Sequence, residues 1–127
     1  MDNLLDTHTL IWFINGDEEI SNKSKEEIEN NPEGNFVSIA SLWEIAIKIS
    51  IAKLEMKASF EDFIYKIRSN SFQILPVSPI DALTVSALPF YHRDPFGRMI
   101  IAQAKNNNLQ IITKDNTFAH YNISLCW

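Results

Sequence analysis

Four carboxylates from separate parts of the chain are the residues best suited to chemistry. One follows the apolar pair Leu4-Leu5, one lies inside "SLWEIAIK", one opens "DPFGRMIIAQA" and one follows "QIITK"; they are Asp6, Glu44, Asp94 and Asp115. Hard cations such as Mg²⁺ or Mn²⁺ take oxygen ligands, and enzymes that cut phosphodiesters use these cations to activate water and neutralise the leaving group. Without a cation, gathered carboxylates would repel one another and some of their pKa values would rise.

Each carboxylate also has a purely structural interpretation. Asp6, Asp94 and Asp115 each precede a predicted helix, where an aspartate caps free backbone N–H groups, and for each taken singly capping is the interpretation we favour. Glu44 lies four residues before Lys48 on a predicted helix, so an exposed ion pair competes with a functional role. The case for function therefore depends on the four residues converging.

Other catalytic patterns are missing. His8, His92 and His120 lack zinc-type spacing, and with a single cysteine, Cys126, a structural zinc site is implausible. Three glycines could hardly build a phosphate-binding loop, and no Gly-x-Ser-x-Gly nucleophile turn occurs. A receiver-like phosphoacceptor domain would need an acidic pair at the first strand and an aspartate on the third, which "NFVS" and "FQILPV" do not supply.

Short apolar runs alternate with helical patterns along the chain. We expect strands near residues 3–6, 35–38, 72–77, 109–113 and 123–127, and helices near 7–14, 22–31, 39–51, 59–69, 80–88 and from 95 onward. This alternation predicts an α/β fold with a parallel sheet covered on both faces. If the first strand and that of residues 109–113 are parallel neighbours, Asp6 and Asp115 emerge at the same edge of the sheet.

Bulk properties fit one domain spanning residues 1–127. The net charge of −5 gives no general attraction for nucleic acid, so local basic groups or bound cations would have to supply it. The longest apolar stretch is interrupted by Glu44 and Lys48, and the N-terminus lacks the basic leader of a signal peptide. We therefore expect a soluble, cytoplasmic protein without a membrane span, and the lone cysteine fits a reducing compartment.

Four linked motifs resemble those of PIN-domain toxins of the VapC type. They are "LLDTHTLIW", "SIASLWEIAIKISIAKL", "HRDPFGRMIIAQA" and "IITKDNTFAHY", in the family's order and spacing, and the resemblance runs from about residue 3 to 122. It implies a three-layer α/β/α fold with a central, mainly parallel sheet of four to five strands and an acidic pocket for Mg²⁺ or Mn²⁺. It also implies an endoribonuclease toxin of a type II toxin–antitoxin system, usually dimeric and held inactive by a VapB-like antitoxin. Contact with DNA would be only indirect, through the antitoxin.

The resemblance also assigns roles to individual residues. Asp6, Glu44 and Asp115 would hold the metal, and Asp94 matches the first acidic residue of the family's "DPFDR" stretch. Residues beside these positions are candidates for contact with the RNA substrate: Thr7, His92, Arg93, Arg98 and Thr113. For the neighbours His92 and Arg93, a solvated loop is the alternative that we favour from the residues alone.

Position 97 departs from the family pattern, because this chain reads "DPFGR" where the family has a second aspartate. Gly97 cannot bind metal, and glycine is also a poor helix former, so no local preference explains it. The favoured explanation is a change introduced or selected because an active ribonuclease poisons its host. The alternatives are a decayed toxin that still binds antitoxin and a shift of Asp94 into the ligand role. We therefore expect an impaired ribonuclease, or alternatively an inactive homologue that binds antitoxin and regulates its operon.

Overall fold

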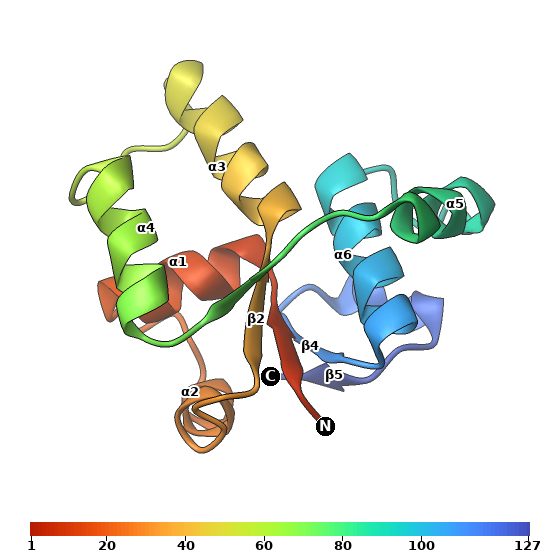
Figure 1. The fold of residues 1–127 in the computed structure, drawn as a ribbon, viewed down its shortest axis with the longest axis horizontal. Helices are drawn as coiled ribbons and strands as arrows, with labels where there is room; N and C mark the ends of the chain where they lie inside the picture. Colours follow the sequence, from red (N-terminus) through yellow and green to blue (C-terminus); the bar gives the residue numbers. More distant parts are fainter.

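The fold is built around a five-stranded parallel sheet. The computed structural model describes all residues 1–127. The strands are β1 (Asn3–Leu5), β2 (Asn35–Ser38), β3 (Gln73–Leu75), β4 (Gln110–Ile112) and β5 (Leu125–Cys126). Their spatial order is β3-β2-β1-β4-β5, and all four pairings are parallel, as Figure 1 shows for the strands at the centre of the molecule.

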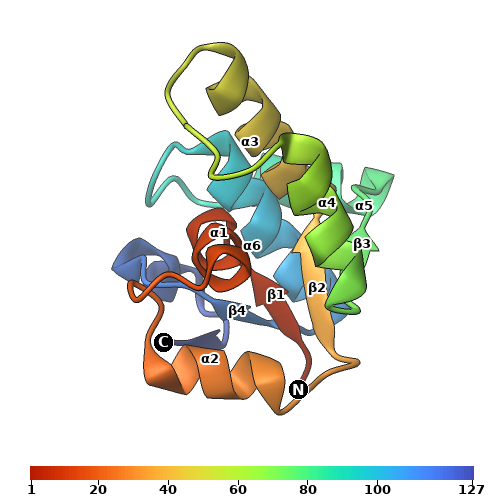
Figure 2. The same ribbon diagram turned by 90° about the vertical axis from the view of Figure 1, so that its left-hand side faces the viewer.

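Helices connect the strands and cover both faces of the sheet (Figures 1 and 2). They are α1 (Thr7–Asn15), α2 (Asn22–Glu29), α3 (Ile39–Ser50), α4 (Phe60–Ser69), α5 (Pro79–Ala87) and α6 (Pro95–Asn107), with a 3₁₀ helix η1 (Asn116–Tyr121). The predicted three-layer α/β/α class is confirmed. The main differences are in length: β3 and β5 are shorter than the apolar runs that predicted them, because the flanking residues make no further ladder pairings.

Successive strand residues face opposite sides of the sheet, and this alternation builds two cores. Leu5 and Ile112 pack into one core with Leu10, Ile45 and Ile67, below α1 to α4. On the other face, a second core combines strand residues with α6 and η1; it contains Leu4, Ile111, Ile100, Ile101, Phe118 and Tyr121. Both faces are therefore buried, as the continuous apolar runs predict.

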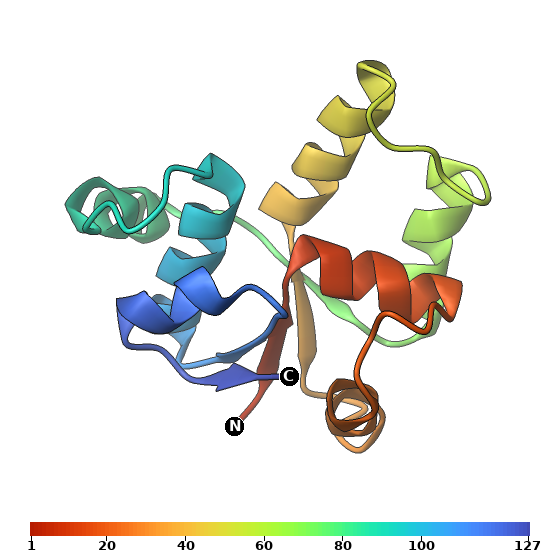
Figure 3. The same ribbon diagram turned by 180° about the vertical axis from the view of Figure 1, so that it is seen from behind.

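The chain changes direction across the sheet next to β1. From β1 it proceeds to β2 and β3 on one side, and β4 and β5 then occupy the other side. Ligands of open parallel sheets bind beyond the carboxyl ends of the strands at such a switch point, which lies here between β1 and β4 (Figure 3). Within this fold, no helix has both the length and the apolar character that crossing a membrane requires.

Candidate active site

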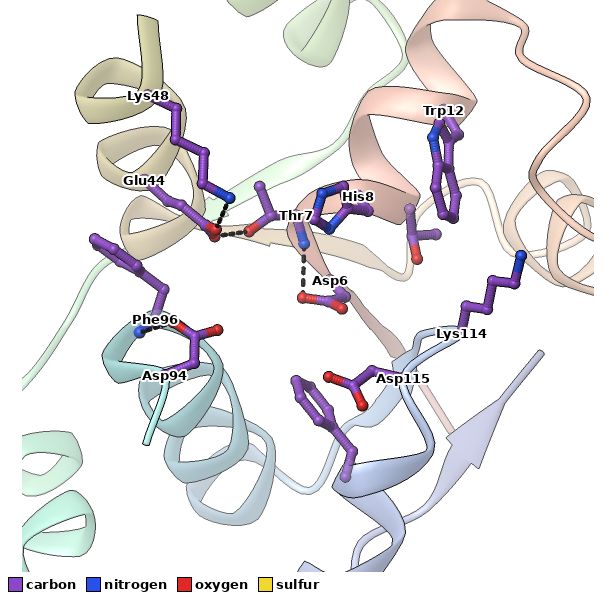
Figure 4. Close-up of a pocket in the computed structure, with 12 residues that line it drawn as sticks. Asp6, Thr7, His8, Trp12, Glu44, Lys48, Asp94, Phe96, Lys114 and Asp115 are labelled. Atoms are coloured by element: carbon purple, nitrogen blue, oxygen red, sulfur yellow. Dashed lines mark hydrogen bonds and ion pairs between the residues drawn. The ribbon is translucent and has the colours of Figure 1, made fainter. Parts of the chain in front are cut away.

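A pocket of about 450 Å³ opens at the carboxyl ends of β1 and β4. Figure 4 shows how side chains from α1, α3, α6 and the segment after β4 face this space. Its walls include all four candidate carboxylates, Asp6, Glu44, Asp94 and Asp115. Residues separated by more than a hundred positions thus meet at one site, at the edge of the sheet where parallel strands end together.

Asp6 lies at the centre of the pocket, directly after β1. Its Oδ1 accepts a hydrogen bond from the Thr7 backbone N–H at 2.8 Å, which caps α1, and its Oδ2 accepts one from the Thr113 hydroxyl at 2.8 Å. Burial raises the pKa of Asp6 above its ordinary value, although these hydrogen bonds and the nearby His8 act in the opposite direction. Glu44 adds a smaller upward contribution through charge repulsion. The fold therefore holds this carboxylate in place at an electrostatic cost.

Glu44 projects from α3 into the pocket and is only 7% exposed. Its Oε1 accepts a hydrogen bond from the Thr7 hydroxyl at 2.6 Å, and its Oε2 is 2.8 Å from the Lys48 ammonium. The ion pair expected from the four-residue spacing is present, but the expectation that it is exposed is wrong for Glu44. The carboxylate is turned inward because Thr7, a buried residue in the first turn of α1, donates a hydrogen bond to its Oε1.

Asp94 and Asp115 cap helices at the pocket rim. Asp94 accepts hydrogen bonds from the backbone N–H groups of Phe96 and Gly97, both at 3.2 Å, at the start of α6. Asp115 accepts from the backbone N–H of Thr117 at 2.9 Å and from its hydroxyl at 2.7 Å, at the start of η1. The capping predicted from sequence is confirmed for these aspartates and for Asp6. Capping and convergence on the pocket are therefore compatible.

Gly97 is buried in the first turn of α6, and other side chains fill the space around it. A Cβ atom here would lie 2.9 Å from His92 Nε2 and 3.0 Å from Asp94 Oδ2. His92 Nδ1 is 2.7 Å from the Tyr121 hydroxyl, whereas the buried Nε2 has no hydrogen-bond partner. The imidazole thus occupies the place that a side chain at position 97 would need.

The other substrate-contact candidates have different surroundings. Thr7 lines the pocket, while Thr113 is buried beneath it and holds Asp6. Arg93 is exposed and is not part of the pocket wall. Arg98 is not brought to the pocket either.

The Arg98 side chain is only 4% exposed and points toward the connection between α5 and α6. Its guanidinium donates hydrogen bonds to the carbonyl oxygens of Val85, Leu88 and Pro89, at 3.3, 3.1 and 2.8 Å. The exposed Phe90 ring covers it, 4.1 Å from the guanidinium carbon to the ring centroid. The guanidinium is therefore directed away from the pocket, toward the carbonyls at the end of α5 and in the connection that follows.

Several pocket residues were not among the predicted site residues. Trp12 and Lys114 form one end of the pocket, with Lys114 Nζ 5.9 Å from the centroid of the Trp12 ring, and His8 lies 5.7 Å from Trp12 between ring centroids. The sequence contained a signal for all three residues. His8 and Trp12 are four residues apart on the helix that follows Asp6, and Lys114 lies between Thr113 and Asp115.

The candidate ligands in the pocket are carboxylate oxygens, which are the type of donor that hard cations such as Mg²⁺ prefer. In the arrangement seen here, however, no three histidine, cysteine or carboxylate groups are close enough together to hold an ion. Lys48 and Thr7 engage Glu44, while Asp94 and Asp115 are turned to their helix caps. These carboxylates could therefore coordinate a cation only after side chains at the rim of the pocket rotate.

The model of the PIN domain family matches residues 4–123 of the chain. Among curated proteins, none is similar enough in sequence to count as a match.

Several solved structures share the fold. A chain of the DNA-bound VapBC complex from Salmonella typhimurium has a TM-score of 0.72 at 17% identity, with 99% of this chain and 97% of that chain covered. A chain of VapBC2 from Rickettsia felis, bound to a DNA fragment from its promoter, has a TM-score of 0.71 at 15% identity. The match covers 99% of this chain and 98% of that chain. A chain of a toxin–antitoxin complex from Klebsiella pneumoniae has a TM-score of 0.68 at 21% identity, and the match covers 99% of this chain and 97% of that chain. With the family model spanning nearly the whole chain and these folds agreeing with it, the chain belongs to the PIN domain family.

Proposed function

We propose that the protein is a VapC-like toxin, an endoribonuclease that hydrolyses RNA phosphodiester bonds. The observation that carries this proposal is the convergence of Asp6, Glu44, Asp94 and Asp115 in one pocket at the switch point of a PIN domain. Structural neighbours that are toxin–antitoxin complexes support the toxin assignment.

The proposed cofactor is Mg²⁺ or Mn²⁺, held by Asp6, Glu44 and Asp115. Such a cation, when bound, supplies positive charge to the phosphate and lowers the pKa of a bound water. Thr113 and the Thr7 N–H fix the orientation of the Asp6 carboxylate, and the Thr7 hydroxyl does the same for Glu44. Asp115, which is exposed at the rim, is the ligand with most freedom to adjust.

Gly97 is expected to impair this activity. The position supplies no carboxylate, and the ends of His92 and Asp94 crowd the space where one would be. Loss of a carboxylate that orients water or metal costs orders of magnitude in rate, since each ~1.4 kcal/mol of lost stabilisation is tenfold.

The alternative is a catalytically inactive homologue that binds a VapB-like antitoxin and regulates its operon, touching DNA only through that partner. The missing carboxylate at position 97 favours this alternative specifically, because it removes a group that catalysis would use and that binding of an antitoxin would not require. Under either proposal the protein acts in the cytoplasm, and a homodimer is the expected assembly.

RNA cleavage in the presence of Mg²⁺ or Mn²⁺ distinguishes these proposals. We expect the Gly97→Asp variant to cleave RNA far faster than the parent chain, and the Gly97→Asp, Asp6→Asn double variant to be inactive. If Gly97→Asp is folded but neither cleaves RNA nor inhibits growth when expressed, the ribonuclease proposal is wrong for this scaffold. Co-purification of an antitoxin with such an inactive protein would then favour the binding module.

A further inference from the structure

The pocket contains positive charge as well as carboxylates. Lys48 and Lys114 are its two lysines, and Figure 4 shows them on opposite sides with Asp6 between them. Lys48 comes from α3 and Lys114 from the segment after β4, so the fold places a cation at each end of the acidic centre. The whole chain is acidic, with a net charge of −5, and offers no general attraction for RNA.

Both ammonium groups keep donors free for a ligand. Lys48 Nζ contacts Glu44 at 2.8 Å, which uses one of its three N–H donors, and its side chain is 36% exposed. Lys114 Nζ is 3.4 Å from Glu19, but both side chains of that pair are 58% exposed, so the pairing is weak. Each lysine can therefore turn a donor toward the pocket without breaking a strong buried interaction.

A phosphodiester chain that enters this pocket meets an electrostatic problem. The phosphate to be cleaved must approach several carboxylates, and its two neighbours along the backbone bring further negative charge to the rim. A cation on each flank offsets that repulsion where it acts. The aromatic pair His8 and Trp12, next to Lys114, offers a surface for an unstacked base, which a single strand can present more easily than a duplex.

We propose that Lys48 and Lys114 bind the backbone phosphates on either side of the cleaved bond in a single-stranded RNA. This inference rests on the proposed function and adds to it how the substrate crosses the pocket. It makes the two lysines positioning residues for RNA, and Lys48 in addition the counter-ion of Glu44 when no substrate is bound.

The dependence of RNA binding on salt tests this proposal without requiring cleavage. The probe is a short, fluorescently labelled, 2′-O-methylated single-stranded RNA, titrated with Mg²⁺ present between about 50 and about 200 mM salt and checked on a gel for intactness. Lys48→Gln and Lys114→Gln should each weaken binding, and each should reduce the slope of log affinity against log salt by about 0.7, the value for one phosphate contact of a single strand. The same RNA annealed to its complement should bind more weakly.

Matched variants separate charge from folding. Lys105→Gln, an exposed lysine in the last turn of α6 and outside the pocket, should leave affinity and slope unchanged, and Lys48→Arg should retain both. Thermal unfolding checks that each variant is folded. If the slopes for Lys48→Gln and Lys114→Gln equal that of Lys105→Gln, or if duplex binds as tightly as single strand, the inference is overturned. A lysine-dependent slope without any cleavage by Gly97→Asp would instead contradict the nuclease while keeping the RNA contacts.

Discussion

Single residues in this pocket serve both the fold and the site. Three aspartates cap helices and line the pocket with the same carboxylate: Asp6, Asp94 and Asp115. For Asp6 the two roles conflict energetically, because burial raises its pKa while its helix cap and Thr113 favour the charged form. Such a residue is retained at a cost in stability.

The Asp6→Asn variant should therefore be more stable than the parent at pH 7. The folded-state pKa is raised, so the ionised carboxylate destabilises the fold above that pKa, and asparagine still caps the helix. We expect a gain of about 1 kcal/mol, or a rise in Tm of about 4 °C, measured by calorimetry. As the pH falls through the raised pKa toward 3.8, the folded parent takes up a proton at Asp6, and the difference in stability between variant and parent should disappear. A difference in stability that grows in acid would contradict a raised pKa for Asp6.

The contact between His92 and Gly97 leads to a second residue-level prediction. An alanine in an exposed helix normally adds about 1 kcal/mol over glycine, but a Cβ at position 97 meets the His92 ring. Gly97→Ala should therefore give little or no gain in the free energy of unfolding, measured in urea. In a His92→Ala background the same substitution should recover most of that gain. Equal effects in both backgrounds would show that the imidazole does not restrict this position.

At the scale of elements, the segment between α5 and α6 sets the position of Asp94. Arg98 reaches back from the first turn of α6 and binds the carbonyl oxygens of Leu88 and Pro89 in this segment, together with that of Val85 in the last turn of α5. The Tyr121 hydroxyl is held between this arginine and His92, at 3.4 Å from the guanidinium and 3.2 Å from the His92 backbone N–H. The connection is therefore fastened to both α6 and η1.

Replacing Arg98 with Met should destabilise the protein by about 2 to 3 kcal/mol, because the buried Leu88 carbonyl and the part-buried carbonyls of Val85 and Pro89 lose the guanidinium donors. Urea denaturation measures this loss. Arg93→Met, which changes the exposed arginine of the same motif, should stay within about 0.5 kcal/mol of the parent. Should Arg98→Met keep full stability but lose RNA affinity, the arginine would be a substrate contact after all.

The elements themselves could largely be predicted from sequence, whereas some side-chain directions could not. Leu4-Leu5 and Ile111-Ile112 are short apolar pairs of the kind found in parallel strands covered on both faces, and they place Asp6 and Asp115 at one edge. The direction of Arg98 depends on carbonyls nine to thirteen positions away in the chain. Likewise, the inward turn of Glu44 depends on Thr7, which only the folded sheet brings to α3. Local patterns carry no information about such partners.

On the scale of the whole molecule, one surface groove is strongly apolar. An apolar groove of about 470 Å³ lies where α3, α5 and α6 approach one another, and it is lined by Ile39, Ala40, Trp43, Val77, Val85, Pro95, Phe96 and Met99. Trp43 lies at the edge of this groove and is 62% exposed. It packs edge-on against Phe96, which also lines the pocket of the four carboxylates. Exposed apolar surface of this kind supports the proposed homodimer.

Trp43→Glu should accordingly shift the protein from dimer to monomer in light scattering at micromolar concentration, because a charge would be buried in the interface. Tyr65→Glu, on the exposed side of α4, changes a residue of similar exposure outside the groove and should leave the assembly unchanged. A parent chain that is already monomeric would refute the dimer, and a dimer that survives Trp43→Glu would place its interface elsewhere.

Titration of the parent chain with Mn²⁺, followed by the electron paramagnetic resonance signal of the free ion, tests the central claim most directly. If the distant carboxylates act together, the chain binds one Mn²⁺, and Asp6→Asn, Glu44→Gln and Asp115→Asn each weaken binding by more than roughly tenfold. Glu61→Gln, on the exposed surface of α4, should have no effect. Mn²⁺ binding that is absent, or that is unchanged by all three pocket substitutions, would contradict the account.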